Sequence, residues 1–260
     1  MPINDVESAV DALLQAENRR EERGRVTTEW PGLDAGTAYE VQRTLIEAKI
    51  AAGEEIVGFK LGLTSKAKQE QMNVDAPLSG WLTDAHQCCN GEPVKVANYI
   101  HPRIEPEIAF ILGRELKGPN CTRDDVKEAT SHITAAFEII DSRYRDFNFA
   151  LPDVIADNAS SAGFILGKTH IKVGEFDLIN EPVELLVDGE VQATATGAAV
   201  LGDPAQAVVD AVNEIATRGQ SLPAGTIVLT GALTDAVFLN PGSKYTARFK
   251  SLGEITVNCL

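Results

Sequence analysis

Residues 104–113 read Ile104-Glu105-Pro106-Glu107-Ile108-Ala109-Phe110-Ile111-Leu112-Gly113, an apolar run with two acids near its beginning. Side chains two residues apart on a β-strand point to the same face, so Glu105 and Glu107 should project side by side. Two carboxylates this close repel each other, and removing both from water is costly unless a proton or a cation lies between them. The run therefore predicts a strand that presents a site for a hard divalent metal ion.

A second strand-like run, Thr134-Ala135-Ala136-Phe137-Glu138-Ile139-Ile140, carries another acid in the same apolar setting. Three oxygen ligands suit Mg²⁺, which keeps open coordination positions for water and substrate, and Mn²⁺ is the alternative ion. A plainer interpretation places Glu105 and Glu107 on the solvated edge of a sheet and lets Glu138 point outward. The occurrence of three acids in apolar strands favours the metal site.

The composition limits the class of ligand. The chain has 260 residues, 44% of them hydrophobic, and carries a formal net charge of -15 with a pI of about 4.7. This length is enough to bury a sizeable core, in one large domain or in a core with a smaller appendage. The acidic balance argues against nucleic-acid binding, which usually needs a basic surface. An anionic ligand would need a metal ion or a well-placed lysine or arginine.

The first residues contain no basic segment followed by an apolar one, and no apolar run approaches about 18 residues. We therefore expect a soluble, cytoplasmic protein that does not associate with membranes.

His101, close to the acidic pair, is expected to be a rim or capping residue or else to touch a ligand. The cysteines lack Cys-x-x-Cys pairing and zinc spacing, so reduced thiols are expected at Cys88, Cys89, Cys121 and Cys259.

Hydrophobic periodicity predicts helices in the first fifty residues, ending near Gly53. Residues 55–61 then read as a strand, and Thr64-Ser65 can cap a short helix that runs to about Met72. The stretch from there to residue 100 is rich in Gly, Pro, Asn and Asp. It is expected to form loops over a site or at a domain junction.

The remaining residues read mostly as strands, with two helices. Thr122-Arg123-Asp124-Asp125 has the order of a capping box, and Asp203-Pro204 supplies a cap and a first-turn proline. Asp188-Gly189, between two alternating segments, predicts a two-residue hairpin turn. Strand–helix–strand alternations are few, which argues against a doubly wound parallel sheet.

Lys60 lies in an apolar strand between two glycines, Gly58 and Gly62. These glycines permit close approach of the backbone to a ligand. A buried lysine beside a metal-bound anion can pair with a carboxylate or transfer a proton. The alternative is a surface lysine whose stem covers apolar atoms while its ammonium stays in water.

Two short polar runs follow other strand-like segments. Residues 157–163 form a turn of small and polar residues whose hydroxyls and amides could hold a carboxylate, and residues 231–234 invite the same interpretation. Such runs are more often simple turns. Neither is specific by itself.

Taken in order, five segments resemble the hydratase and decarboxylase branch of the fumarylacetoacetate hydrolase superfamily, enzymes of catechol meta-cleavage pathways. The resemblance extends from about Val57 to the C-terminus. The matching segments are Gly58-Phe59-Lys60-Leu61-Gly62-Leu63-Thr64-Ser65, Pro102-Arg103-Ile104-Glu105-Pro106-Glu107-Ile108-Ala109, Phe137-Glu138-Ile139-Ile140-Asp141-Ser142-Arg143, Ala156-Asp157-Asn158-Ala159-Ser160 and Leu229-Thr230-Gly231-Ala232-Leu233. The implied fold is α+β: a mixed, β-rich roll in a catalytic domain over residues 81–260, with a smaller, mostly helical N-terminal part over residues 1–80.

The resemblance also implies roles for particular residues. Lys60 would be an active-site base or anion partner, and Ser160 would lie in the catalytic pocket. The implied Mg²⁺ ligands are Glu105, Glu107 and Glu138. The implied substrate contacts are Leu63, Leu78, Asp141 and Ser161.

One loop separates the two activities of this branch. Similar hydratases usually read Val-Asp-Gln-Pro-Asp-Phe-Gly after the lysine motif, and the second Asp is thought to position or activate water. Here the run is Val74-Asp75-Ala76-Pro77-Leu78-Ser79-Gly80, so Leu78 replaces that acid. An apolar side chain cannot orient water, but it can desolvate a departing carboxylate, which favours loss of CO₂. Residues 140–149 also look more like the decarboxylase pattern, because hydratases commonly carry Trp after the second Asp.

The expected reaction is therefore metal-dependent decarboxylation of 4-oxalocrotonate (2-oxohex-3-enedioate), a small anionic 2-oxo diacid, to 2-hydroxypenta-2,4-dienoate or its keto tautomer. One alternative is hydration of 2-hydroxypenta-2,4-dienoate, which would use the same metal-site residues. A second is a non-catalytic partner that stabilises a hydratase. The resemblance further implies a homo-oligomer and a complex with the pathway hydratase.

Overall fold

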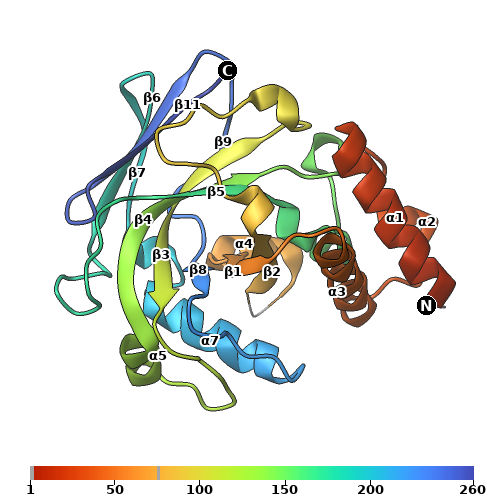
Figure 1. Cartoon of the computed structure of the whole chain (residues 1–260), viewed down its shortest axis with the longest axis horizontal. Coiled ribbons are helices and arrows are strands. Elements are labelled where there is room, and N and C mark those ends of the chain that lie inside the picture. The colour runs from red at the N-terminus through yellow and green to blue at the C-terminus, as the bar shows by residue number, and fades with distance from the viewer. Residues whose placement is uncertain (1–2, 75–76) are drawn as a thin grey trace.

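The computed structural model describes residues 3–74 and 77–260. Figure 1 shows the N-terminal helices on one side of the molecule and a four-stranded sheet on the opposite side, with the longest strands between them. The N-terminal helices are α1 (Ile3–Arg19), α2 (Val26–Glu29) and α3 (Ala35–Ala51). Their apolar stripes pack together, and Gly53 follows α3 with a φ of +104°, as the predicted helix end requires.

A seven-stranded sheet carries the candidate site residues. Its order is β2-β1-β8-β3-β4-β5, and β9 pairs with the free edge of β3. Among the described strands only β1 and β8 run parallel, so the predicted absence of a doubly wound parallel sheet is confirmed. The strands are β1 (Ile56–Gly62), β2 (Leu78–Thr83), β3 (Arg103–Leu112), β4 (Thr130–Ile140), β5 (Ser161–Leu166), β8 (Ile227–Leu229) and β9 (Val237–Phe238).

A second, antiparallel sheet has the order β11-β10-β6-β7. Asp188 and Gly189 connect β6 to β7 with φ angles of +52° and +89°, which confirms the predicted two-residue hairpin turn. The strands are β6 (Pro182–Val187), β7 (Glu190–Thr196), β10 (Lys244–Phe249) and β11 (Glu254–Asn258).

The main core lies between these two sheets and the helix α7 (Pro204–Ala216). Fully buried aromatic side chains from both sheets meet there, among them Phe110, Phe137 and Tyr245. Each contributes about 1.5–3 kcal/mol by leaving water.

The two predicted helix caps are confirmed. Thr122 and Asp125 form the capping box of α5 (Arg123–Ala129), and the Asp203 carboxylate accepts from the backbone N–H of Ala205 at the start of α7. The α+β class is likewise confirmed.

The prediction of loops from residue 73 to residue 100 is wrong in its first part. Strand β2 forms there and pairs along β1, with Lys60 opposite Gly80. The short helix α4 (Lys66–Met72) precedes it as predicted. Asp75 and Ala76, in the run that distinguishes the two activities, lie outside the described residues. The predicted domain boundary at residue 80 stays a prediction.

The short 3₁₀ turns are η1 (Asp84–His86), η2 (Val96–Asn98), η3 (Arg145–Phe147), η4 (Asn158–Ser160) and η5 (Gly197–Ala199), and a short helix, α6 (Leu151–Ala156), lies between η3 and η4. No helix in the described part of the chain is both long enough and apolar enough to span a membrane.

Candidate active site

Strand β3 separates core residues from site residues by simple alternation. Ile104, Ile108 and Phe110 face the main core, whereas Glu105 and Glu107 face the other side. The neighbouring strand β4 places Glu138 directly opposite Glu105 in the antiparallel register. Ligand oxygens of the three acids lie within 4.8 Å of one another. The structure therefore brings together the three carboxylates that the sequence singled out.

The hydrogen-bond ladder on the other edge of β3 is interrupted where the acids lie. β9 pairs with residues 103–104 and β8 pairs with residues 109–111. In the gap, the backbone N–H of Gly231 donates to Glu107 Oε2 at 2.7 Å. Gly231 has a φ of +111°, and a Cβ there would lie 2.0 Å from Thr64 Oγ1, so no larger residue fits. This glycine thus orients one carboxylate of the cluster.

Lys60 reaches the acids from two strands away. Strand β8 lies between β1 and β3, with Leu229 paired to both Lys60 and Ala109. The Lys60 side chain is buried, and its Nζ lies 3.2 Å from Glu138 Oε2 and donates to the backbone carbonyl of Ala159 at 3.2 Å. The alternative of a solvated surface lysine is excluded by this burial.

The charges in this cluster are out of balance. Burial raises the pKa of Glu107 well above its ordinary value, and the charges of Glu138 and Glu105 raise it further. Burial also raises the pKa of Glu138 to about 7, although Lys60 acts in the opposite direction. For Lys60, burial lowers the pKa, but the three carboxylates together outweigh it and raise the pKa above its ordinary value. One ammonium therefore faces three carboxylates in a nearly dry site.

A divalent cation fits this arrangement. Glu107 Oε1 and Glu138 Oε1 are buried and have no hydrogen-bond partner among the described residues. Orphaned buried carboxylate oxygens are costly, and carboxylate oxygens are the ligands that Mg²⁺ prefers. Glu105, Glu107 and Glu138 would hold the ion, and Mn²⁺ accepts the same ligands.

Metal affinity should depend on pH. Because Mg²⁺ competes with protons for buried carboxylates, binding at a pH below about 7 must displace the proton of Glu138. Glu107, whose pKa is also raised well above its ordinary value, holds a second proton that the ion must displace. We expect the affinity to rise by up to about tenfold for each pH unit per displaced proton, with a smaller slope above about pH 7, where Glu138 is already ionised. Calorimetric Mg²⁺ titrations in two buffers of different ionisation enthalpy would count the released protons. An affinity that is constant between roughly pH 6 and pH 8 would contradict this expectation.

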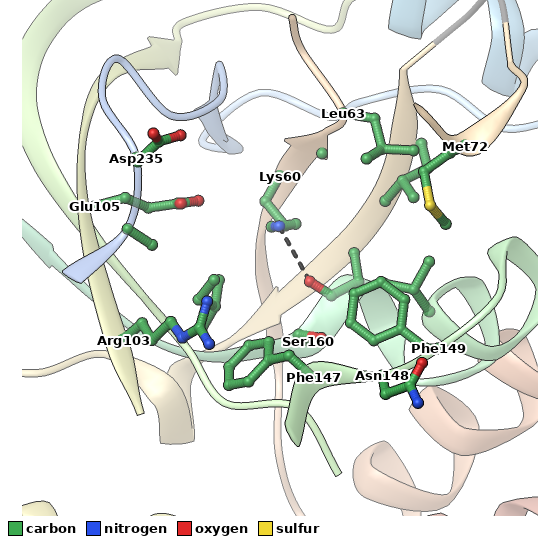
Figure 2. Close-up of a pocket in the computed structure, with 16 residues that line it drawn as sticks. Lys60, Leu63, Met72, Arg103, Glu105, Phe147, Asn148, Phe149, Ser160 and Asp235 are labelled. Carbon is green, nitrogen blue, oxygen red and sulfur yellow. Dashed lines mark hydrogen bonds between the residues drawn. The ribbon is translucent and has the colours of Figure 1, made fainter. Parts of the chain in front are cut away.

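A cavity of about 490 Å³ opens in front of the acids. Figure 2 shows Lys60, Glu105 and Arg103 pointing into it from β1 and β3, with Leu63, Met72 and Phe149 on the opposite side. Leu78 closes one wall and is so tightly packed that a Cβ at Gly62 would lie 2.7 Å from its Cδ1. The cavity thus combines a charged end with apolar walls.

The polar turn at residues 157–163 forms another wall. Asn158, Ala159 and Ser160 all have positive φ angles, a strained conformation for residues with a Cβ. The Asn158 side chain holds the turn by hydrogen bonds to both backbone groups of Trp81 in β2. Ser160 lines the cavity as predicted, and its hydroxyl donates to Asp157 Oδ2 at 3.4 Å.

Three other predicted residues lie outside the cavity lining. The Asp141 carboxylate accepts the backbone N–H groups of Ile100 and His101 at 2.7 and 2.8 Å, so it fixes that loop. Ser161 is buried, and its hydroxyl has no hydrogen-bond partner among the described residues. The His101 ring contacts the Ser142 carbonyl at 2.7 Å and stacks near Phe147, as expected for a rim residue. The predicted substrate contacts of Asp141 and Ser161 remain predictions without support from their positions.

Sequence reasoning missed several lining residues. Arg103 lies two residues before Glu105, so the same alternation that identified the acids could have found it. Asp235 lies in the loop after β8, and Phe147 and Phe149 lie in the loop after β4. No periodicity marks a loop, so these residues carried no signal.

The N-terminal helical part holds the cavity walls in place. Gln42 on α3 is buried and donates to the carbonyls of Ser79 in β2 and Ile155 in α6, at 2.8 and 3.1 Å. The segment after α1 pairs with the loop that carries Phe147, through hydrogen bonds between Arg23 and residues 143 and 145 at 2.8 and 2.9 Å. These residues therefore position the site without lining it.

Comparison with known proteins gives a consistent family. The model of the fumarylacetoacetate (FAA) hydrolase C-terminal family matches residues 55–259. A 4-oxalocrotonate decarboxylase from Pseudomonas sp. is 43% identical over 236 residues, which cover 90% of this chain and 91% of that protein. A 2-keto-4-pentenoate hydratase from Burkholderia vietnamiensis is 40% identical over 225 residues, 86% of each chain.

A solved structure resembles the whole chain. It is the 4-oxalocrotonate decarboxylase from Pseudomonas putida G7 complexed with magnesium and adipate, which matches with a TM-score of 0.97 and 38% identity over 100% of this chain and 99% of that one. Since a family model covers most of the sequence and relatives above 30% identity cover nearly all of it, the chain belongs to the fumarylacetoacetate hydrolase family.

Proposed function

We propose that the chain is a Mg²⁺-dependent carboxy-lyase that converts 4-oxalocrotonate to 2-hydroxypenta-2,4-dienoate or its keto tautomer, in catechol meta-cleavage degradation. Decarboxylases of this substrate are among the relatives, and one was solved with magnesium and a six-carbon diacid, adipate. The observation that carries the choice of reaction is Leu78, which is buried in the cavity wall where a similar hydratase would place an acid.

The substrate can lose CO₂ because its 2-oxo group is conjugated with the C3=C4 double bond, which adjoins the carbon that bears the leaving carboxylate. Held by the three glutamates, Mg²⁺ would supply a Lewis acid for the 2-oxo acid end. When the bond to the carboxylate breaks, its electron pair moves toward the 2-oxo oxygen, and a proton must be returned to the product. Lys60, an ammonium beside the acids, balances that developing charge and is placed to donate the proton.

One wall of the cavity is apolar and keeps water away from the substrate. Leu63, Leu78 and Phe149 are apolar and offer no group that could orient a nucleophilic water. Ser160 and the carbonyl of Ala159 come from the strained turn and offer polar atoms near Lys60. This division suits loss of CO₂ more than addition of water.

Hydration of 2-hydroxypenta-2,4-dienoate is the second candidate function, because a 2-keto-4-pentenoate hydratase is 40% identical to the chain. One experiment separates the two. The protein is incubated with Mg²⁺ and 2-oxohex-3-enedioate, and CO₂ is measured; a parallel sample receives 2-hydroxypenta-2,4-dienoate, and loss of the dienoate is followed by absorbance. Decarboxylase activity predicts CO₂ in the first sample and slow or no change in the second. Rapid hydration without CO₂ release would overturn the proposal, and no turnover in either would favour the non-catalytic partner.

Leu78→Asp should impair decarboxylation by at least about tenfold, because it adds charge and water to the apolar wall of the cavity beside Lys60. Leu78→Asn is the matched control, since it has nearly the same shape without the charge. Both variants disturb the contact of Leu78 with Gly62, so thermal denaturation must first show that they are folded. If Leu78→Asp decarboxylates as fast as the wild-type protein, the side chain does not act through desolvation, and equal impairment in Leu78→Asn would assign the effect to polarity and not to charge.

We propose a cytoplasmic protein with a domain boundary after residue 80. On the strength of the family resemblance, we also propose a homo-oligomer and a complex between this chain and the pathway hydratase. Gel filtration with light scattering, alone and with the hydratase, would test the two assemblies.

A further inference from the structure

Arg103 is the first residue of β3 and lies on the same face as Glu105 and Glu107. It lines the cavity, and Figure 2 shows its guanidinium at the end opposite Leu63 and Met72, beside Phe147. Arg103 is not part of the three-carboxylate cluster.

The guanidinium is held, but not by a counter-ion. Its Cζ lies 4.1 Å from the ring centroid of Phe147 and 4.4 Å from that of Phe238. Arg103 Nε is buried without a hydrogen-bond partner, and Glu105, the carboxylate whose charge acts on Arg103, forms no hydrogen bond or salt bridge with it in the described part of the chain. Contacts with ring faces fix the position of a guanidinium without using its N–H donors. The donors of Arg103 are therefore ordered and free for an acceptor in the cavity.

The spacing along β3 suggests which acceptor this is. Two residues on a strand advance about 6.6 Å, so Arg103 lies about that far from Glu105 along the same face. This is close to the separation of the two terminal carboxyl carbons in an extended six-carbon diacid. A diacid held by its 2-oxo acid end at the three glutamates would reach Arg103 with its other carboxylate.

The charge of the cavity leads to the same ligand. The three glutamates, Lys60 and a bound divalent ion would together carry no net charge, and the exposed Asp235 at the edge of the cavity adds a negative one. Arg103 therefore supplies the positive charge that would attract the second carboxylate of a dianion. A planar guanidinium also matches a carboxylate with two parallel hydrogen bonds.

We propose that Arg103 is the specificity-determining residue that selects a diacid over a monoacid, by binding the carboxylate remote from the metal site. The proposal rests on the proposed function, since it names the group that recognises the substrate's leaving carboxylate. Because this contact exists before the bond breaks, its loss should appear mainly in KM and much less in kcat.

The test compares two inhibitors that differ only in the remote carboxylate, 2-oxohexanedioate and 2-oxohexanoate, in the presence of Mg²⁺. We expect the wild-type protein to bind the diacid at least about tenfold more tightly than the monoacid. Arg103→Gln should lose most of this preference while keeping its affinities for 2-oxohexanoate and for Mg²⁺. Arg103→Lys should show an intermediate preference for the diacid, because it keeps the positive charge but cannot form two parallel hydrogen bonds with a carboxylate. Arg114→Gln, which removes an exposed guanidinium outside the cavity, should behave as the wild type.

Three results would overturn the proposal: no preference for the diacid in the wild type, an unchanged preference in Arg103→Gln, or an equal loss of affinity for both inhibitors, which would mean a structural role. The affinity for 2-oxohexanoate shows at the same time whether the variant is folded. The proposed function is tested separately, by CO₂ release from 2-oxohex-3-enedioate. If the wild-type protein releases no CO₂, the proposed function fails whatever the inhibitor affinities are.

Discussion

Glu138→Gln should abolish Mg²⁺ binding and turnover together. The side chain is fully buried, lies opposite Glu105 in the β3–β4 register, and has one oxygen beside Lys60 and another with no hydrogen-bond partner in the described residues. Glutamine keeps the shape but removes the charge that a divalent ion needs. Loss of several kcal/mol of charge stabilisation corresponds to at least about a thousand-fold loss of turnover.

The same result is expected for Glu105→Gln and Glu107→Gln, because all three acids share one cluster. Calorimetric Mg²⁺ titration and CO₂ release should be measured on each variant, with circular dichroism to show that the fold is intact. Glu128→Gln, which removes an exposed carboxylate on α5 outside the cavity lining, is the control and should bind Mg²⁺ normally. The assignment is wrong if each variant keeps wild-type metal affinity, or if the wild-type enzyme turns over after exhaustive chelation.

Lys60→Ala should lower turnover by about two to four orders of magnitude, the usual loss for a group that moves a proton or balances charge in the transition state. Unlike the glutamate variants, Lys60→Ala should not weaken Mg²⁺ binding. Lys60 and Mg²⁺ are both cations beside the same carboxylates, so removing the ammonium should leave Mg²⁺ affinity unchanged or make it tighter. Parallel measurement of CO₂ release and Mg²⁺ affinity separates this role from ligation.

Lys60→Met is the matched variant, because it retains much of the apolar stem of the side chain. Loss of turnover in both variants would assign the effect to the ammonium and exclude a packing defect. Lys250→Met, at an exposed position in the C-terminal region, is the control for removal of a lysine charge. Near wild-type turnover in Lys60→Met would show that the ammonium has only a structural role.

Local patterns predicted the local structure well. The caps at Thr122 and Asp203 and the turn at Asp188-Gly189 depend on hydrogen bonds and φ angles within a few residues, so the sequence contains all the information they need. The alternation along residues 104–113 likewise predicted which side chains share a face. Strand β2 was missed, because its six residues lie in a stretch rich in turn-forming residues and its formation depends on pairing with β1.

The candidate site shows the same limit. Alternation placed Glu105 and Glu107 together, the apolar run around Glu138 indicated a third acid, and the glycines around Lys60 indicated a lysine near a ligand. The family resemblance joined these residues into one site. Asp141 was expected in the pocket from its motif, but its carboxylate is occupied by two backbone N–H groups. Arg103, which alternation could have found, was overlooked because arginines near strand ends are common and carry no signal by themselves.

By itself, the sequence determined the residue types and their spacing along each strand: two acids on one face of β3, a third acid in β4 and a lysine between glycines in β1. Only the tertiary structure decided that these become one site. The β3–β4 register brings Glu138 opposite Glu105, the insertion of β8 between β1 and β3 sets the reach of Lys60, and the loop after β4 brings Phe147 onto Arg103. The physical reason is that strand register and strand order depend on burial and hydrogen bonding between segments far apart in the chain, which no local pattern encodes.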